Sequence, residues 1–172
     1  MMGTKLIVVE YNPNWVKKFE ELRDFVFPVL SDLKVTIEHV GSTAIPGIAA
    51  KPIVDIDVVV PTQSDILVAV KRLANLGYVH EGDLGIPGRE AFLPPRDVDW
   101  HHLYLCTVDN AEYKRHILFR DYLRNHPVDA KRYSQLKQML VKQFKGDRSG
   151  YTNAKSDFVR DILNRAGWND LN

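Results

Sequence analysis

The segment Lys51-Pro-Ile-Val-Asp-Ile-Asp-Val-Val-Val60 decides the fold, because its apolar background predicts a buried β-strand that nevertheless carries two aspartates. Side chains alternate along a strand with period two, so Asp55 and Asp57 are expected on one face and the aliphatic residues between them on the other. Buried carboxylates without partners are costly, and like charges repel. The pattern therefore favours a divalent cation between the two aspartates.

A glycine-led turn, Gly41-Ser42-Thr43, precedes this strand. Phosphate loops bind anions through backbone N–H groups at tight turns, which suits a glycine followed by small hydroxyl residues. The spacing is not that of a Walker A loop, because Lys51 does not directly follow Gly47, and no dinucleotide-binding glycine motif occurs. Together with the aspartates, the turn predicts a phosphate site beside a metal site.

The composition indicates one ordinary globular domain. The chain has 172 residues, of which 45% are hydrophobic and 26% charged. No apolar stretch approaches the roughly 20 residues that span a bilayer, and the N-terminus lacks the apolar region of a signal peptide. We therefore expect a cytoplasmic protein without a membrane partner. The single cysteine, Cys106, excludes an internal disulfide and is expected to pack within a strand.

The net charge of +1 argues against a protein that binds nucleic acid stably and without specificity. It conceals an asymmetry, because residues 1–110 hold 10 Lys and Arg against 15 Asp and Glu, whereas residues 111–172 hold 13 against 7. The basic half is either a set of solvated helix faces or a surface that attracts a polyanion. In the second interpretation, the acidic half binds the cations that accompany that polyanion.

The order of elements predicts an α+β fold in one domain, with a mixed sheet core over residues 1–110 and a helical part over 111–172. Strands are expected over residues 5–10, 35–40, 51–60, 78–81, 89–93 and 101–107. Helices are expected from about residue 14 to near Pro28, and over about 64–77, 110–125, 128–145 and 152–165.

The stretch Glu38-His-Val-Gly-Ser-Thr-Ala-Ile-Pro-Gly-Ile-Ala-Ala-Lys-Pro-Ile-Val-Asp-Ile-Asp57 closely resembles the signature of the GrpB-like (UPF0157) family, which is placed in the nucleotidyltransferase-fold superfamily. The resemblance extends across nearly the whole chain. It includes Tyr11-Asn-Pro-Asn-Trp15, Gly85-Ile-Pro-Gly-Arg89, His101-His102-Leu-Tyr104, Phe119-Arg-Asp-Tyr-Leu-Arg124 and Tyr151-Thr-Asn-Ala-Lys155.

The resemblance implies a nucleotidyltransferase fold in which Gly41 and Ser42 hold the β- and γ-phosphates of an NTP. It also implies that Asp55 and Asp57 ligate one or two Mg²⁺ ions, which prefer oxygen ligands. A hydroxyl of a small-molecule acceptor would attack the α-phosphorus and release pyrophosphate. The sequence leaves the acceptor, the preferred base and the oligomeric state open.

The superfamily normally adds a third carboxylate from a neighbouring strand, and its identity stays open here. In the strand over 101–107, His102 and Tyr104 are expected on one face. The family motif usually reads His-Leu-His, so Tyr104 departs from it. His102 is either a general base or a hydrogen-bonded structural histidine. The remaining carboxylate candidates are Glu81, Asp83, Glu90 and Asp99.

Several basic residues are candidates for phosphate binding, and each is also an ordinary solvated cation in the alternative interpretation. Lys51 is the closest to the glycine turn. Arg89 follows a Gly-Ile-Pro-Gly turn, which favours phosphate or acceptor recognition, with an ion pair to Asp83 as the alternative. The helical candidates are Arg120, Arg124, Lys137 and Lys155. His39, Trp15, Phe19, Tyr133 and Phe158 are expected to be structural.

Three functions follow from these residues. The first is a Mg²⁺-dependent nucleotidyltransferase that moves an NMP from an NTP to a small-molecule acceptor. The second is a catalytically inactive nucleotide-binding module, which the missing third carboxylate favours. The third is a regulator that modifies or silences a partner protein. A polymerase on single strands is disfavoured by the near-zero net charge.

Overall fold

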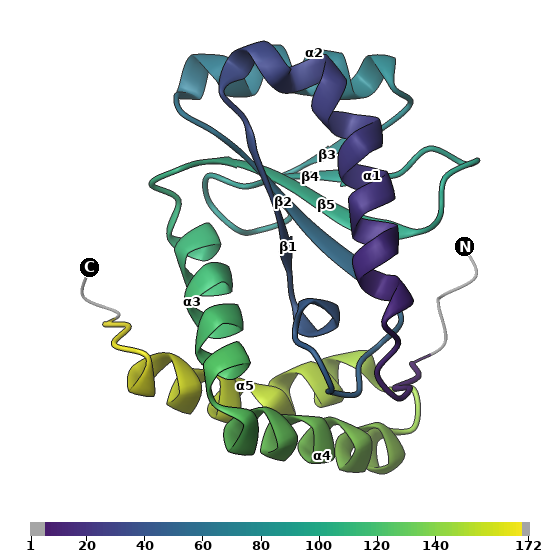
Figure 1. Ribbon diagram of the computed structural model, residues 1–172, viewed down its shortest axis with the longest axis vertical. Helices are drawn as coiled ribbons and strands as arrows, with labels where there is room; N and C mark the ends of the chain where they lie inside the picture. The colour runs from purple at the N-terminus through teal and green to yellow at the C-terminus, as the bar shows by residue number, and fades with distance from the viewer. Residues whose placement is uncertain (1–5, 170–172) are drawn as a thin grey trace.

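A five-stranded mixed sheet forms the centre of the computed structural model, which describes residues 6–169 (Figure 1). Its strands are β1 (Thr36–Val40), β2 (Val54–Val60), β3 (Val79–Gly82), β4 (Glu90–Leu93) and β5 (His101–Thr107). The helices are α1 (Asn14–Leu30), α2 (Gln63–Asn75), α3 (Ala111–Asn125), α4 (Pro127–Phe144) and α5 (Arg148–Arg165), with 3₁₀ turns η1 (Ser31–Leu33) and η2 (Ser42–Ala44). The strand order is β1-β2-β5-β4-β3, and the β2–β5 pair is parallel. The predicted α+β class is confirmed.

One face of the sheet is covered by α1 and α2. Apolar residues recur at helical spacing in both helices and alternate along β2 and β5. This core includes Trp15, Leu22, Val26 and Leu30 from α1, Ile66, Ala69 and Leu73 from α2, and Val54, Ile56, Val58, Leu103 and Leu105 from the sheet. Burying each large aliphatic side chain contributes about 1.5–3 kcal/mol, so this core fixes which side of β2 faces inward.

The helices α3, α4 and α5 gather at the end of the molecule away from α2 (Figure 1). Their shared core packs on the loop between η2 and β2, through Ile45, Ile48, Leu123, Ala130, Tyr133 and Ile162. The backbone N–H of Ala49 in this loop donates to Ser134 Oγ of α4 at 2.8 Å. The helical part therefore holds in place the segment that joins the glycine turn to the aspartate strand.

The structure corrects two predicted strand boundaries. Of the strand predicted over 5–10, Lys5 lies outside the described residues, and the remainder forms an isolated bridge between Val9 and Ala50. The strand predicted from residue 51 begins at Val54. Pro52 has no N–H to donate to a neighbouring strand, which explains the later start.

The end of α1 and the start of α5 are determined by residues near them, a proline and a capping aspartate. The first helix ends two residues beyond Pro28, close to the predicted position. The last helix was predicted from about residue 152 but begins at Arg148, because the Asp147 side chain accepts a hydrogen bond from the Gly150 N–H and caps it. Among residues 6–169, no helix is long and apolar enough to cross a membrane.

Candidate functional site

Asp55 and Asp57 project from β2 onto the face of the sheet opposite α1 and α2, as the alternation predicts. The register of β5 places His102 beside Asp55 and Tyr104 beside Asp57, and the register of β1 places Glu38 beside Asp57. Residues paired directly across neighbouring strands project from the same face. We call these five side chains the aspartate face.

The glycine of the Gly-Ser turn touches the first aspartate. Gly41 has φ +75°, a backbone conformation that favours glycine, and a Cβ built on it would lie 2.2 Å from Asp55 Oδ2. The turn continues into η2, where the Ala44 N–H donates to the Gly41 carbonyl at 3.1 Å. The sequence pattern of glycine turn and aspartate strand therefore corresponds to direct contact in space.

Gly41→Ala is expected to lower the free energy of unfolding by about 2 kcal/mol or more, because it combines left-handed strain with a clash against Asp55. Gly47→Ala is the matched control, since Gly47 has φ +82° and no atom within 4 Å of its added Cβ. That control is expected to lose only the backbone cost of about 1 kcal/mol. Urea denaturation measures both, and equal losses would contradict a special role for the contact with Asp55.

The other two turn residues have different neighbours. The Ser42 side chain is hydrogen-bonded to Tyr133 of α4. Thr43 is buried, and its Oγ1 lies 2.8 Å from His39 Nε2. His39 stacks on Phe19, and burial lowers its pKa to about 4, so the ring is neutral. This agrees with the structural role expected for His39.

Three lysines from separate segments converge beside the turn. They enclose a pocket of about 130 Å³, which we call the lysine pocket. Lys51 comes from the loop before β2, Lys137 from α4 and Lys155 from α5. The other lining residues are Ser42, Thr43, Ile53, Asp55, His102 and Tyr151. The structure thus brings Lys51 and Lys155, both predicted to bind phosphate, next to the Gly-Ser turn.

Lys137 is the buried member of this cluster. Its exposure is 1%, and among the described residues its Nζ has no hydrogen-bond partner, although it lies 4.4 Å from the centre of the Tyr133 ring. Burial, helped by repulsion from Lys155 and Lys51, lowers the pKa of Lys137 to about 7. Burial and Lys51 also lower the pKa of Lys155 to about 8. An unpaired buried cation is costly, so the pocket is suited to an anion.

Asp57 is paired with a histidine that the sequence did not single out. Asp57 is 2% exposed, and its Oδ2 lies 2.7 Å from His116 Nδ1 of α3. The other ring nitrogen of His116 lies 3.2 Å from Glu112 Oε1. Burial opposes the charge on His116, but the hydrogen bonds to Asp57 and Glu112 prevail and raise its pKa to about 10. Burial raises the pKa of Asp57, and the His116 imidazolium counteracts this.

The predicted strand histidine contacts the first aspartate. His102 Nδ1 lies 2.6 Å from Asp55 Oδ1, and the imidazole is 41% exposed at the edge of the lysine pocket. The neighbouring His101 points into the core, where its Nε2 is hydrogen-bonded to Tyr78 at 2.8 Å. The two histidines therefore face opposite sides of the sheet, as predicted.

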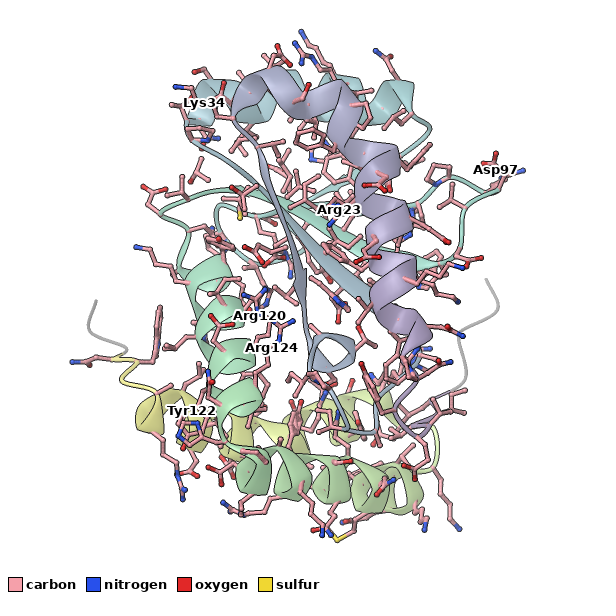
Figure 2. All side chains as sticks on the ribbon, in the orientation of Figure 1. Arg23, Lys34, Asp97, Arg120, Tyr122 and Arg124 are labelled. Atoms are coloured by element: carbon pink, nitrogen blue, oxygen red, sulfur yellow. The ribbon has the colours of Figure 1, made fainter. Side chains whose placement is uncertain are left out.

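The predicted arginines lie elsewhere. Figure 2 shows Arg120 and Arg124 on α3. Arg120 donates to Glu38 at 2.7 Å, to Asp121 at 2.9 Å and to the His39 carbonyl at 3.0 Å, so groups of the protein itself engage the guanidinium that was predicted to bind phosphate. Arg124 donates to the Ala44 carbonyl at 2.9 Å. Arg120 is 8% exposed, so it ties α3 to β1 and does not line the lysine pocket.

Arg89 lies over the aspartate face, outside the lysine pocket. Its guanidinium is 4.3 Å from the centre of the Tyr104 ring. Its Nη2 donates to the backbone carbonyl of Asp83 at 3.3 Å, so the alternative of an ion pair with that carboxylate is wrong. Arg89 is therefore placed to meet a group that approaches from the Tyr104 side.

None of the four candidates for a third carboxylate belongs to the aspartate face. Glu90 accepts from His80 at 2.6 Å, and Asp99 pairs with Lys18 at 3.5 Å. Glu81 is an exposed residue of β3 whose charge acts on Tyr104, and Asp83 lies in the exposed turn that follows this strand. The carboxylates that do adjoin Asp57 are Glu38, its register partner, and Glu112, which reaches it through His116.

Asp55 and Asp57 fit a magnesium ion by their chemistry, because Mg²⁺ binds one or two carboxylates together with phosphate oxygens and waters. The bonds to His102 and His116 use one oxygen of each aspartate. Within residues 6–169, no group of three or more His, Cys, Asp and Glu side chains is arranged to hold a metal ion.

Lys137 and His116 carry signals that the sequence offered. In α4, Lys137 falls on the buried stripe with Ala130, Tyr133 and Leu140, where burying a charge is costly and therefore indicates a function. In α3, Glu112, His116 and Arg120 recur every four residues and so share one face of the helix. The informative patterns were a lysine at a core position of α4 and a row of charged and titratable residues on one face of α3.

The sheet, the glycine turn and the helical part together form a nucleotidyltransferase fold. The Cid1 poly(U) polymerase, solved with MgGTP bound, has a TM-score of 0.56 and 15% sequence identity, over 78% of this chain and 43% of that chain. At this identity the likeness concerns the fold.

The chain belongs to the GrpB family, whose model, described as GrpB protein, matches residues 5–165. The crystal structure of GrpB from Enterococcus faecalis has a TM-score of 0.82 and 33% identity, covering 93% of this chain and 96% of that chain. The glutamate-rich protein GrpB of Alkalihalophilus pseudofirmus is 34% identical over 93% of this chain and 95% of its own length. UPF0157 protein YqkA of Bacillus subtilis is 33% identical over 91% of this chain, which spans 46% of that relative. The predicted family membership is confirmed.

Proposed function

We propose that this chain is a Mg²⁺-dependent nucleotidyltransferase that transfers an NMP from an NTP to a small-molecule acceptor. The observation that carries the proposal is the lysine pocket, where the buried Lys137 ammonium has no hydrogen-bond partner within residues 6–169 and Asp55 forms part of the wall. A triphosphate brings several negative charges to such a cluster. The neighbouring Asp55 carboxylate would ligate the metal ion that accompanies that triphosphate.

Each residue of the site has a distinct task in this reaction. The three lysines bind the β- and γ-phosphates, with the Gly41-Ser42 turn alongside them. Asp55 and Asp57 would hold Mg²⁺, whose chemistry there is to neutralise charge on the phosphate oxygens. Glu112 and Asp57 keep His116 charged, and His116 in turn favours the ionised form of Asp57 despite its burial.

The proton of the acceptor needs a base near the α-phosphorus. In the proposed step, the acceptor oxygen forms a bond to the α-phosphorus as the bond to the bridging oxygen of pyrophosphate breaks. His102 Nε2 takes the hydroxyl proton, because Nδ1 is engaged with Asp55 Oδ1. Arg89, stacked on Tyr104, lies on the side from which an acceptor approaches.

Asp55→Asn is expected to abolish pyrophosphate release, lowering the rate by about a hundredfold or more, because a neutral amide binds Mg²⁺ poorly. The assay combines the protein, each NTP in turn, Mg²⁺ and a metabolite extract. Asp99→Asn is the matched control, since Asp99 is an exposed carboxylate paired with Lys18, and it should keep the activity. If the wild type releases no pyrophosphate with any of the NTPs, the proposed enzyme activity is contradicted.

An inactive nucleotide-binding module is the second candidate, and Tyr104 is the observation that favours it. Tyr104 lies beside Asp57 on β5, where the superfamily normally supplies a carboxylate. Calorimetry with a non-hydrolysable NTP separates the two candidates. Affinity that depends on Mg²⁺ and is lost in Asp57→Asn supports the enzyme, whereas affinity indifferent to that substitution supports the module.

A further inference from the structure

An apolar chamber lies next to the lysine pocket. Its volume is about 360 Å³, and its apolar walls are Leu6, Ile7, Pro52, Ile53 and Trp100. Trp100 is 50% exposed, so a large part of its indole is available to a ligand. We call this cavity the Trp100 chamber.

The two cavities adjoin each other. Lys51, Ile53 and His102 line both of them, and Arg148 is the remaining lining residue of the chamber. The lysine pocket also contains Asp55, so a single ligand can reach from Lys137 past Asp55 and His102 to Trp100. Such a ligand is polyanionic at one end and apolar at the other, with its middle at the aspartate face.

A nucleoside triphosphate has this distribution of chemistry. Its phosphates match the lysines, and its base offers a flat aromatic surface that stacks favourably on an indole. A cavity of this size lies within the range that holds small ligands and accommodates a nucleobase with its sugar. We infer that the Trp100 chamber binds the nucleobase of the NTP, with Trp100 as the residue on which the base stacks. This inference rests on the proposed function and adds the base subsite to it.

The acceptor is the competing occupant of the chamber. In an in-line displacement, the attacking oxygen enters opposite the leaving pyrophosphate. Tyr104 and Arg89 lie on a part of the aspartate face that lines neither cavity, and they leave a separate approach for the acceptor. The ring centre of Tyr104 is 6.2 Å from that of His102, so an acceptor on this side still meets the proposed base.

The test compares two ligands in the presence of Mg²⁺: a non-hydrolysable NTP, which reaches both cavities, and inorganic tripolyphosphate, which reaches only the lysine pocket. Trp100→Ala is expected to weaken NTP binding about tenfold or more while leaving the affinity for tripolyphosphate unchanged. Trp100→Phe should restore most of the NTP affinity, because a phenyl ring also stacks. Calorimetry measures each dissociation constant.

A matched control is Phe27→Ala, which removes another exposed aromatic side chain, 45% exposed on α1, and should change neither affinity. The inference is overturned if Trp100→Ala leaves NTP affinity intact, if wild type binds NTP no more tightly than tripolyphosphate, or if the substitution raises only the KM of an acceptor. Lys137→Met should weaken the binding of both NTP and tripolyphosphate. If wild type binds neither ligand, the proposed function fails, and the inference fails with it.

Discussion

Lys137→Met is expected to weaken NTP binding about a hundredfold, and at the same time to stabilise the ligand-free protein. The amine is buried without a hydrogen-bond partner among the described residues, so methionine removes a desolvated charge and fills a similar volume. The free energy of unfolding near neutral pH should rise by roughly 2–4 kcal/mol. Calorimetry with NTP and urea denaturation without it measure the two opposite effects.

The pH dependence of stability gives a second readout of the same substitution. The folded pKa of Lys137 is about 7, below its ordinary value of 10.5, so the unfolded chain binds more protons between these values. Stability therefore rises with pH across that window, and the penalty is fully present below pH 7. Lys51, Lys155, Tyr133 and Tyr151 also face this amine and titrate in both proteins, and Asp55 and His102 line the same pocket in both. The difference between wild type and Lys137→Met should shrink as the pH rises from about 7 to about 10.

Lys142→Met is the matched control for the Lys137 prediction, because Lys142 is an exposed lysine on the same helix. It should change neither NTP affinity nor the pH dependence of stability. If Lys137→Met destabilised the ligand-free protein, the amine would have a structural role. The proposal that the lysine pocket binds an anion would then lose its main support, the buried charge of Lys137, which is unpaired within residues 6–169.

The sequence could predict those parts of the site that depend on the local pattern of residues, namely the two aspartates of β2 and the glycine turn. Asp55 and Asp57 share a face because strand geometry requires it, and the interleaved aliphatic residues fix that face toward solvent and α3. The Gly41 turn was predictable for a similar reason, since a glycine with positive φ has a recognisable sequence context. Both features depend on residues close together in the chain.

The positions of the candidate cations depend on tertiary structure. Arg120 pairs with Glu38, which lies 82 residues away, and no local pattern distinguishes that structural pair from a phosphate clamp. Lys51, Lys137 and Lys155 meet because α4 and α5 pack on the loop before β2. The sequence set Lys51 apart by its place near the turn, but only the structure shows that Lys137 is the buried one of the three lysines.

The Asp57–His116 pair explains how an almost fully buried carboxylate remains ionised. Burial alone favours the protonated acid, which would bind a cation poorly. The imidazolium of His116 opposes this effect of burial on the Asp57 pKa, and it is itself held charged by two carboxylates, Asp57 and Glu112. A neutral replacement at position 116 leaves Asp57 buried without its counter-charge.

His116→Gln is therefore expected to lower the free energy of unfolding by about 3 kcal/mol at pH 6 in metal-free buffer, the usual cost of removing one partner of a buried pair. His116 has a folded pKa of about 10, above its ordinary 6.5, so its contribution is complete below pH 6.5 and is lost as the pH rises to about 10. The destabilisation measured by urea denaturation should accordingly be smaller at about pH 10.

A double-mutant cycle with Asp57→Asn separates the pair from its surroundings. In the double variant Asp57→Asn with His116→Gln, two neutral amides can hydrogen-bond to each other, so the combined loss should be smaller than the sum of the single losses. Strict additivity would mean that the two side chains do not stabilise each other, and the proposed counter-charge would then lie elsewhere. His126→Ala removes an exposed histidine that stacks on Tyr122 and is hydrogen-bonded to the Tyr122 carbonyl but has no buried charge partner, so it should cost clearly less free energy of unfolding than His116→Gln, about 1 kcal/mol.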